Sequence, residues 1–186
     1  MVKLNKIYTR TGDTGESGLV DGSRRKKTDP RFAAIGDVDE ANAAIGMAIA
    51  AIDQSNPASA VLLRVQNDLF DLGADLATPG DIEGALRLGS GSVEYLEAQI
   101  DGLTSALAPL TSFVLPGGTE AAARLHVART VVRRAERTTI ALHKTAPLNP
   151  EILKYLNRLS DLLFQMARVQ NNNGADDVLW KPGGYA

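Results

Sequence analysis

Apolar side chains recur at spacings of three and four residues along five stretches of this sequence, and Pro or Gly separates each stretch from the next. This spacing places the apolar side chains on one face of an α-helix. No alternating run of apolar and polar residues exceeds four or five residues, so strand signals are nearly absent. We therefore predict an all-α fold, a five-helix bundle with ferritin-like up-down packing. The expected helices cover residues 31–55, 58–77, 92–108, 119–144 and 151–171.

The chain has 186 residues, of which 44% are hydrophobic, and we expect a single domain. A chain of this size can bury a hydrophobic core without disulfide or metal cross-links. Residues 1–30 show turn chemistry, residues 31–172 hold the helices, and residues 173–186 form a C-terminal tail. Four Gly between positions 79 and 91 predict a mobile loop, after which Ser92 is expected to cap the third helix.

Composition excludes several classes of protein. The chain has no Cys, which excludes disulfide scaffolds, thiolate metal sites and cysteine nucleophiles. A formal net charge of -2 argues against a nucleic-acid-binding protein, which normally carries a basic excess. No apolar run approaches the roughly 18 residues of a membrane span, and the polar start differs from a signal peptide. We expect a cytoplasmic protein with no nucleic-acid or membrane partner.

Charge is nevertheless segregated along the chain. Residues 24–31 carry a net charge of +4 and residues 129–137 a net charge of +3, whereas residues 66–101 carry -7. Two basic stretches in an otherwise acidic chain favour a local anionic ligand.

The second basic stretch places three Arg on one face of the predicted fourth helix, with Glu136 in reach. Arg is suited to bidentate phosphate contacts, although a solvated stripe is the alternative. The predicted fifth helix carries further polar groups, so the two helices are expected to form a polar wall. The Arg stripe consists of Arg129, Arg133 and Arg137, and the fifth helix adds Asn157, Arg158, Asp161 and Arg168.

The segment before the first helix is rich in Gly and hydroxyl groups. Glycines allow close backbone approach, and successive N–H groups can cradle phosphate oxygens. The spacing is not that of a Walker loop, and a Gly-rich surface turn is the alternative reading. The hydroxyl and cationic candidates are Thr9, Thr11, Thr14, Ser17, Arg10 and Lys27.

Asp39 follows apolar Val38 in the first helix, so the pattern allows it to point either inward or toward solvent. If it points inward, burial requires a cation, for which Arg129 is the preferred partner. His126 and His143 lie 17 residues apart, too far for one-face ligation, so no protein-ligated metal site is predicted.

Five segments, in order along almost the whole chain, resemble the ATP:cob(I)alamin adenosyltransferases of the propanediol-utilisation (PduO) type. The Arg-Arg-Ala-Glu-Arg block at 133–137 and the Leu-Asn-Arg-Leu-Ser-Asp block at 156–161 are the most specific. The matching segments are residues 6–15, 36–42, 113–118, 128–137 and 155–161.

The resemblance implies a five-helix bundle that assembles as a homotrimer, with three sites between subunits. ATP would lie against the N-terminal segment of one subunit and the Arg-rich helix of the next. Asp39 and Arg129 would form an intersubunit salt bridge, and Phe113 would line the corrin side. The nucleotide contacts would be Thr9, Arg10, Thr11, Gly12, Ser17, Gly18, Lys27, Arg133, Arg134, Glu136, Arg137 and Asn157.

The reaction implied by the resemblance is adenosyl transfer. Co(I) attacks the 5′ carbon of ATP, and triphosphate leaves with its Mg²⁺. Phe113 would keep lower ligands off a four-coordinate Co(II) corrinoid, which makes its reduction easier. The residues expected to act in catalysis are Arg133, Phe113, Asp39 and Arg129.

A flavoprotein reductase and an adenosylcobalamin-dependent acceptor enzyme are the implied partners. Two alternatives stay open: an ATP-gated cobalamin carrier or sensor without turnover, and a helical scaffold whose Arg face only makes oligomer contacts.

Overall fold

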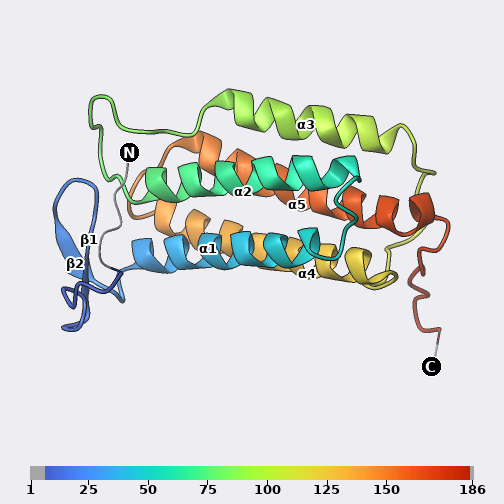
Figure 1. Ribbon diagram of the computed structural model, residues 1–186, viewed down its shortest axis with the longest axis horizontal. Coiled ribbons are helices and arrows are strands. Elements are labelled where there is room, and N and C mark those ends of the chain that lie inside the picture. Colours follow the sequence, from blue (N-terminus) through green and yellow to red (C-terminus); the bar gives the residue numbers. More distant parts are fainter. Residues whose placement is uncertain (1–6, 185–186) are drawn as a thin grey trace.

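The computed structural model describes residues 7–184, which form five helices and a small sheet (Figure 1). Consecutive helices run in opposite directions along one bundle, which confirms the predicted all-α, five-helix fold. Residues 1–6 and 185–186, which belong to the predicted N-terminal segment and tail, lie outside the described part. The elements are β1 (Glu16–Gly18), β2 (Arg24–Lys26), α1 (Pro30–Ile49), α2 (Pro57–Leu76), α3 (Ser90–Thr104), α4 (Glu120–His143), α5 (Pro150–Gln170) and a 3-10 turn, η1 (Asn172–Gly174).

Four of the five helices start at side-chain caps. Asp29, Asn56 and Asn149 each accept a bond from the backbone N–H two residues on, and Pro follows each of them at the first helical position. Thr119 caps α4 by accepting from the Ala122 N–H. A polar cap followed by Pro supplies an acceptor and a preset φ, so these starts follow from local sequence.

Two helix ends differ from the sequence prediction. α1 ends at Ile49, because the N–H groups of Ala51 and Ile52 donate to oxygens three residues back instead of four. Asp53 then forms a separate turn by accepting bonds from the N–H and hydroxyl of Ser55. The prediction that Ser92 caps α3 is wrong. The helix begins at Ser90, and its N-cap Gly89 offers no side chain; it ends at Thr104, well before residue 108.

Small residues bring α1 and α4 together. Ala34, Ala41 and Ala48 on α1 are buried and recur every seven residues, and the same holds for Ala121, Ala128 and Ala135 on α4. α1 also contacts α2, while α5 contacts α4 and α3. The Arg-bearing helix α4 is thus held between α1 and α5, which leaves part of its surface free for a ligand.

A two-stranded antiparallel hairpin, β1 with β2, precedes the bundle, although the sequence predicted no strand. Strands of three residues are too short to show alternation. The Val20 N–H donates to the Ala77 oxygen (3.0 Å), and buried Arg31 donates to the Leu76 oxygen (2.5 Å). The Val20 bond fixes the hairpin at the end of the bundle where α2 ends, opposite the C-terminal tail (Figure 1). The Arg31 bond joins the start of α1 to the end of α2.

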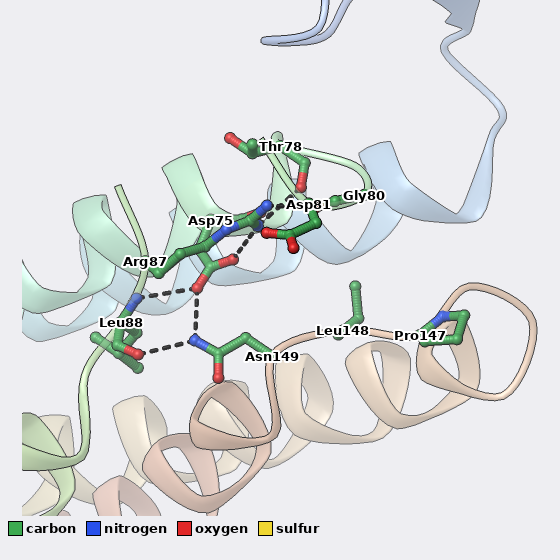
Figure 2. Close-up of a pocket in the computed structure, with 9 residues that line it drawn as sticks. All are labelled: Asp75, Thr78, Gly80, Asp81, Arg87, Leu88, Pro147, Leu148 and Asn149. Carbon is green, nitrogen blue, oxygen red and sulfur yellow. Dashed lines mark hydrogen bonds and ion pairs between the residues drawn. The ribbon is translucent and has the colours of Figure 1, made fainter. Parts of the chain in front are cut away.

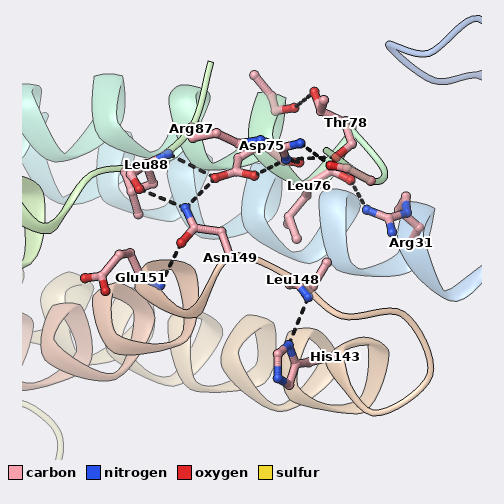
Figure 3. Close-up of polar contacts among 12 residues, drawn as sticks. Arg31, Asp75, Leu76, Thr78, Arg87, Leu88, His143, Leu148, Asn149 and Glu151 are labelled. Carbon is pink, nitrogen blue, oxygen red and sulfur yellow. Dashed lines mark hydrogen bonds and ion pairs between the residues drawn. The ribbon is translucent and has the colours of Figure 1, made fainter. Parts of the chain in front are cut away.

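A buried carboxylate organises the hairpin end of the bundle. The side chain of Asp75 is 1% exposed and accepts bonds from Arg87 Nη1 (2.6 Å), the Leu88 N–H (2.9 Å) and Asn149 Nδ2 (2.8 Å). These residues line a cavity of about 550 Å³ (Figure 2). Asn149 also caps α5, so one network joins α2, the loop at 79–89 and α5 (Figure 3). The loop predicted to be mobile is therefore anchored at Arg87 and Leu88.

Replacing Asp75 tests this anchor. We expect Asp75→Asn to lower the free energy of unfolding by about 2 kcal/mol, because an amide nitrogen would face donors that now bind a carboxylate oxygen. Thermal or urea unfolding measures the change. Asp81→Asn is the matched control, since Asp81 lines the same cavity but is exposed. Equal stability of the two variants would contradict the role of Asp75.

Candidate functional site

The N-terminal segment forms a compact loop around Gly12. A Cβ built on Gly12 would lie 2.9 Å from Lys27 Nζ, so the ammonium group sits directly over this glycine. The Lys27 N–H donates to the Gly15 oxygen (2.8 Å), and the hydroxyls of Thr9 and Thr11 are 2.9 Å apart. The structure therefore brings together the predicted phosphate-binding residues Thr9, Thr11, Gly12 and Lys27.

Arg10 adopts a left-handed backbone conformation with φ of 63°. This region is uncommon for residues other than Gly, and such conformations gather at ligand sites. The guanidinium lies 5.5 Å from the ring centroid of Tyr8. Arg10 is exposed, and so is available to an anion.

Three of the five cations in the first basic stretch are occupied by structural contacts, buried Arg31 among them. Arg24 donates to the Thr11 oxygen (2.6 Å) and pairs with Glu16, while Arg25 pairs with Asp29. Lys26 and Lys27 have no ion pair among residues 7–184 and remain open to a ligand. Ser17 and Gly18 lie in β1, paired with Arg25 and Arg24 of β2.

The Arg stripe on α4 is graded in exposure. Arg133 and Arg137 are exposed, and neither has an ion pair within the described residues. Arg129 is half-buried, and its Nε has no hydrogen-bond partner there. Burial lowers the pKa of Arg129, and the nearby charge of Arg133 lowers it further. An anion at this stripe would relieve both effects.

The remaining polar residues of α4 divide between two neighbours. Arg134 turns toward α1, where it pairs with Glu40 and lies 3.9 Å from Asp37. Glu136 turns toward α5 and accepts a bond from Asn157 Nδ2 (3.0 Å).

Part of the predicted polar wall is present beside the Glu136–Asn157 pair. Arg158 Nη1 donates to Asn157 Oδ1 (2.6 Å), and its Nε donates to Glu97 (3.0 Å). The prediction for Arg168 is wrong, because this residue is buried and pairs with Asp177 in the tail.

An apolar hollow of about 690 Å³ opens beside the stripe. It contains Phe113 and Arg129, two of the predicted catalytic residues, together with Phe164 and Trp180. The sequence reasoning missed Phe164 and Trp180. Trp180 is the one Trp in the chain, which is a composition signal, but its position depends on a contact with Phe113 that no local pattern predicts.

Asp39 points to solvent, so the inward orientation considered from the sequence is wrong. It lines a separate hollow between α1 and α2 with Phe32 and Phe70. Asp39 and Arg129 are not paired among residues 7–184.

The candidate residues of one chain fall into two separate groups. Thr9, Gly12 and Lys27 belong to the hairpin end, whereas Phe113 lies in the α3–α4 connection at the tail end (Figure 1). No hydrogen bond or ion pair within the described part joins residues 9–27 to α4.

The two His are structural, as expected. His126 is buried, and burial lowers its pKa, with a smaller effect from Arg129. His143 Nδ1 accepts from the Leu148 N–H (3.1 Å) and shapes the α4–α5 turn (Figure 3). Residues 7–184 contain no cluster of three His, Asp or Glu suited to a metal ion. Across the same range, no helix has the length and apolar character needed to cross a membrane.

Comparisons with known proteins match this arrangement. A family model described as "Cobalamin adenosyltransferase" matches residues 7–170. A corrinoid adenosyltransferase from Mycobacterium tuberculosis is 52% identical over 188 residues, covering 98% of this chain and 96% of that protein. A corrinoid adenosyltransferase from Bacillus subtilis is 44% identical over 177 residues, covering 93% and 91%.

Solved structures agree. A Phe-to-Ala variant of the PduO-type ATP:corrinoid adenosyltransferase from Lactobacillus reuteri, complexed with cobalamin and ATP, has a TM-score of 0.89 at 39% identity. The match covers 95% of this chain and 99% of that one. An Arg-to-Lys variant complexed with ATP has a TM-score of 0.86 at 38% identity, with 94% and 100% covered. This chain therefore belongs to the cobalamin adenosyltransferase family.

Proposed function

We propose that this protein is an ATP:corrinoid adenosyltransferase, which moves the 5′-deoxyadenosyl group of ATP to the cobalt of cob(I)alamin. Relatives that align over nearly the whole chain carry this activity in their names, and a structural neighbour holds both cobalamin and ATP. The observation that carries the proposal is the hollow that holds Phe113 next to the exposed Arg stripe. An apolar macrocycle and a polyanion would meet at that boundary.

The proposed reaction needs no nucleophilic side chain. Co(I) supplies the electron pair, the Co–C5′ bond forms, the C5′–O bond breaks, and triphosphate leaves with those electrons. The protein contributes positioning and charge stabilisation. We assign charge neutralisation to Arg10, Lys27, Arg133 and Arg137, and orientation of the nucleoside to Glu136 with Asn157. Because cobalt is the nucleophile, the reaction needs no cysteine thiolate, and the chain has no Cys.

Other nucleotide contacts are proposed from the N-terminal segment. Thr9, Thr11 and Gly12 lie beside Lys27, and Ser17 and Gly18 follow in β1. Arg134 is assigned to the same site, although in one chain its guanidinium is engaged by Glu40.

We propose that the working site lies between subunits of a homotrimer. One chain keeps its N-terminal loop and the α3–α4 connection, which bears Phe113, at opposite ends of the bundle, so a second copy supplies the missing half (Figure 1). Asp39 is exposed, and half-buried Arg129 has no ion pair among residues 7–184, which fits a salt bridge formed across the interface. Exposed Met47 and Phe70 give α1 and α2 apolar surface to bury there.

Mg²⁺ is proposed to arrive with the nucleotide. The described residues offer no carboxylate cage, and Mg²⁺ commonly binds through phosphate oxygens and water. The flavoprotein reductase and the adenosylcobalamin-dependent acceptor enzyme stay proposals, as does a cytoplasmic location. We also propose that the chain is a single domain, which consists of an ATP-binding segment (1–30), a bundle (31–172) and a tail (173–186).

An anaerobic assay with ATP, Mg²⁺ and chemically reduced cobalamin tests the activity. We expect the spectrum of a Co–C bond and one triphosphate per adenosyl group transferred. ATP binding without triphosphate release would support the ATP-gated carrier instead. If ATP does not raise the melting temperature of the protein, the result would support the helical scaffold.

Gly12→Ala should weaken ATP binding about tenfold, because the new methyl group displaces the Lys27 ammonium and a charged hydrogen bond is lost. Calorimetric titration of ATP measures the change. Gly102→Ala is the control, since a Cβ there meets open space on α3. If the Gly12 variant binds ATP as tightly as the control does, Lys27 is not held for phosphate.

A further inference from the structure

Phe113 is poorly fixed by the bundle itself. The residue lies in the connection between α3 and α4, outside any helix, and it is 77% exposed. An exposed ring on an irregular segment changes rotamer freely unless something holds it. The ring that contacts Phe113 is that of Trp180, with centroids 6.0 Å apart and planes at 50°. This tilted geometry is one that aromatic pairs prefer.

The tail also holds the backbone beneath Phe113. The Trp180 N–H donates to the Phe113 oxygen (2.7 Å), and the Leu115 N–H donates to the Val178 oxygen (2.8 Å). Ser112 Oγ adds a bond to the Trp180 oxygen (2.7 Å). These bonds form a short antiparallel bridge that uses the Phe113 oxygen and the Leu115 N–H.

A buried ion pair anchors the start of this bridge to the bundle. Arg168 Nε of α5 donates to Asp177 Oδ2 (2.9 Å), and the two side chains are 6% and 3% exposed. Asn171 Nδ2 donates to the other Asp177 oxygen (3.0 Å). Arg168 Nη2 reaches the Ala108 oxygen (2.9 Å), so the same guanidinium ties down the tail and the segment leading to Phe113.

We propose that Trp180 is a positioning residue for Phe113, and that the strap formed by residues 177–180 holds the Phe113 ring at the face of the corrinoid. The inference rests on the proposed function, because it assigns a task to Phe113 in adenosyl transfer. Trp180 acts through the Phe113 ring and the bridge, and Asp177 acts by fixing the strap to α5.

Trp180→Ala is the direct test. Loss of the ring contact leaves Phe113 correctly placed for a smaller fraction of the time, so we expect kcat to fall about fivefold to tenfold. The KM for ATP should stay unchanged, because the nucleotide-binding residues are elsewhere. Trp180→Phe keeps an aromatic ring and should restore most of the rate. Lys181→Ala, one residue further along the exposed tail, is the matched control and should behave as wild type.

Co(II)cobalamin supplies a readout that a general loss of stability would not move. With ATP bound, the visible and electron paramagnetic resonance spectra report how much corrinoid has lost its lower ligand. We expect Trp180→Ala to reduce this fraction while its melting temperature stays close to that of Lys181→Ala. Asp177→Asn should reduce the fraction as well, since it loosens the strap without touching the ring.

Wild-type kcat and a wild-type Co(II) spectrum in Trp180→Ala would overturn the inference, as would a Trp180→Phe variant as impaired as the Ala variant. Failure of the proposed function looks different, because then the wild-type protein itself forms no Co–C product and releases no triphosphate.

Discussion

Replacing Phe113 by Ala is expected to abolish most adenosyl transfer while ATP still binds normally. The fall in kcat should be on the order of 10²–10³, the effect of removing one preorganised group from an active site. Phe113 lines the apolar hollow beside Arg129. In the proposed site, its ring would exclude water and nitrogen ligands from the cobalt. Without the ring, the corrinoid would keep a lower ligand and resist reduction.

Separate measurements of ATP affinity and turnover check this prediction. ATP titration should give equal dissociation constants for wild type and Phe113→Ala, while the rate of Co–C bond formation falls. Phe113→Leu, which keeps an apolar side chain, should retain more activity than the Ala variant. A normal rate in Phe113→Ala, or an equal loss of ATP binding, would remove Phe113 from the role assigned to it.

Arg133→Ala is expected to lower kcat/KM for ATP by about 10²–10³, with little change in stability. Arg133 is exposed on α4 and has no ion pair among residues 7–184, so the folded chain does not depend on its charge. An Arg beside a triphosphate contributes bidentate bonds to the charge that develops on the leaving group. The kcat/KM of Arg133→Lys should fall between those of wild type and Arg133→Ala, because Lys keeps the charge but lacks the planar guanidinium fork.

Lys154→Ala, which removes an exposed cation from α5, is the control for the loss of charge alone. It should leave kcat/KM for ATP unchanged. Thermal unfolding without ATP decides between a ligand-binding and a structural role. If Arg133→Ala lowers the melting temperature as strongly as Asp75→Asn does, Arg133 supports the fold instead of the nucleotide.

Local chemistry explains which parts of the fold were predictable. The expected helix starts at residues 31, 58, 119 and 151 lie within one residue of the observed starts. These helices begin at Asp29, Asn56, Thr119 and Asn149, and such a cap needs only neighbouring residues. The hairpin was missed because its strands of three residues depend on cross-strand bonds, which carry no periodic signal.

In the candidate site, too, local sequence predicts some features, whereas others depend on contacts between distant segments. Spacing alone placed Arg129, Arg133 and Arg137 on one face of α4, and the structure agrees that the latter two are exposed. The orientation of Asp39 could not be predicted, because α1 carries apolar or small residues on most of its surface. The contact of Phe113 with Trp180 joins segments far apart in the chain, and no local pattern encodes it.

Co-expression of two inactive variants tests the central claim, that adenosyl transfer occurs at a site shared between copies of the chain. Lys27→Ala damages the N-terminal loop and Arg133→Ala damages the stripe. In randomly mixed copies of the proposed trimer, an intact loop meets an intact stripe at roughly one site in four. Formation of adenosylcobalamin at about a quarter of the wild-type rate is the predicted result. Activity no higher than that of the two variants assembled separately would contradict the shared site.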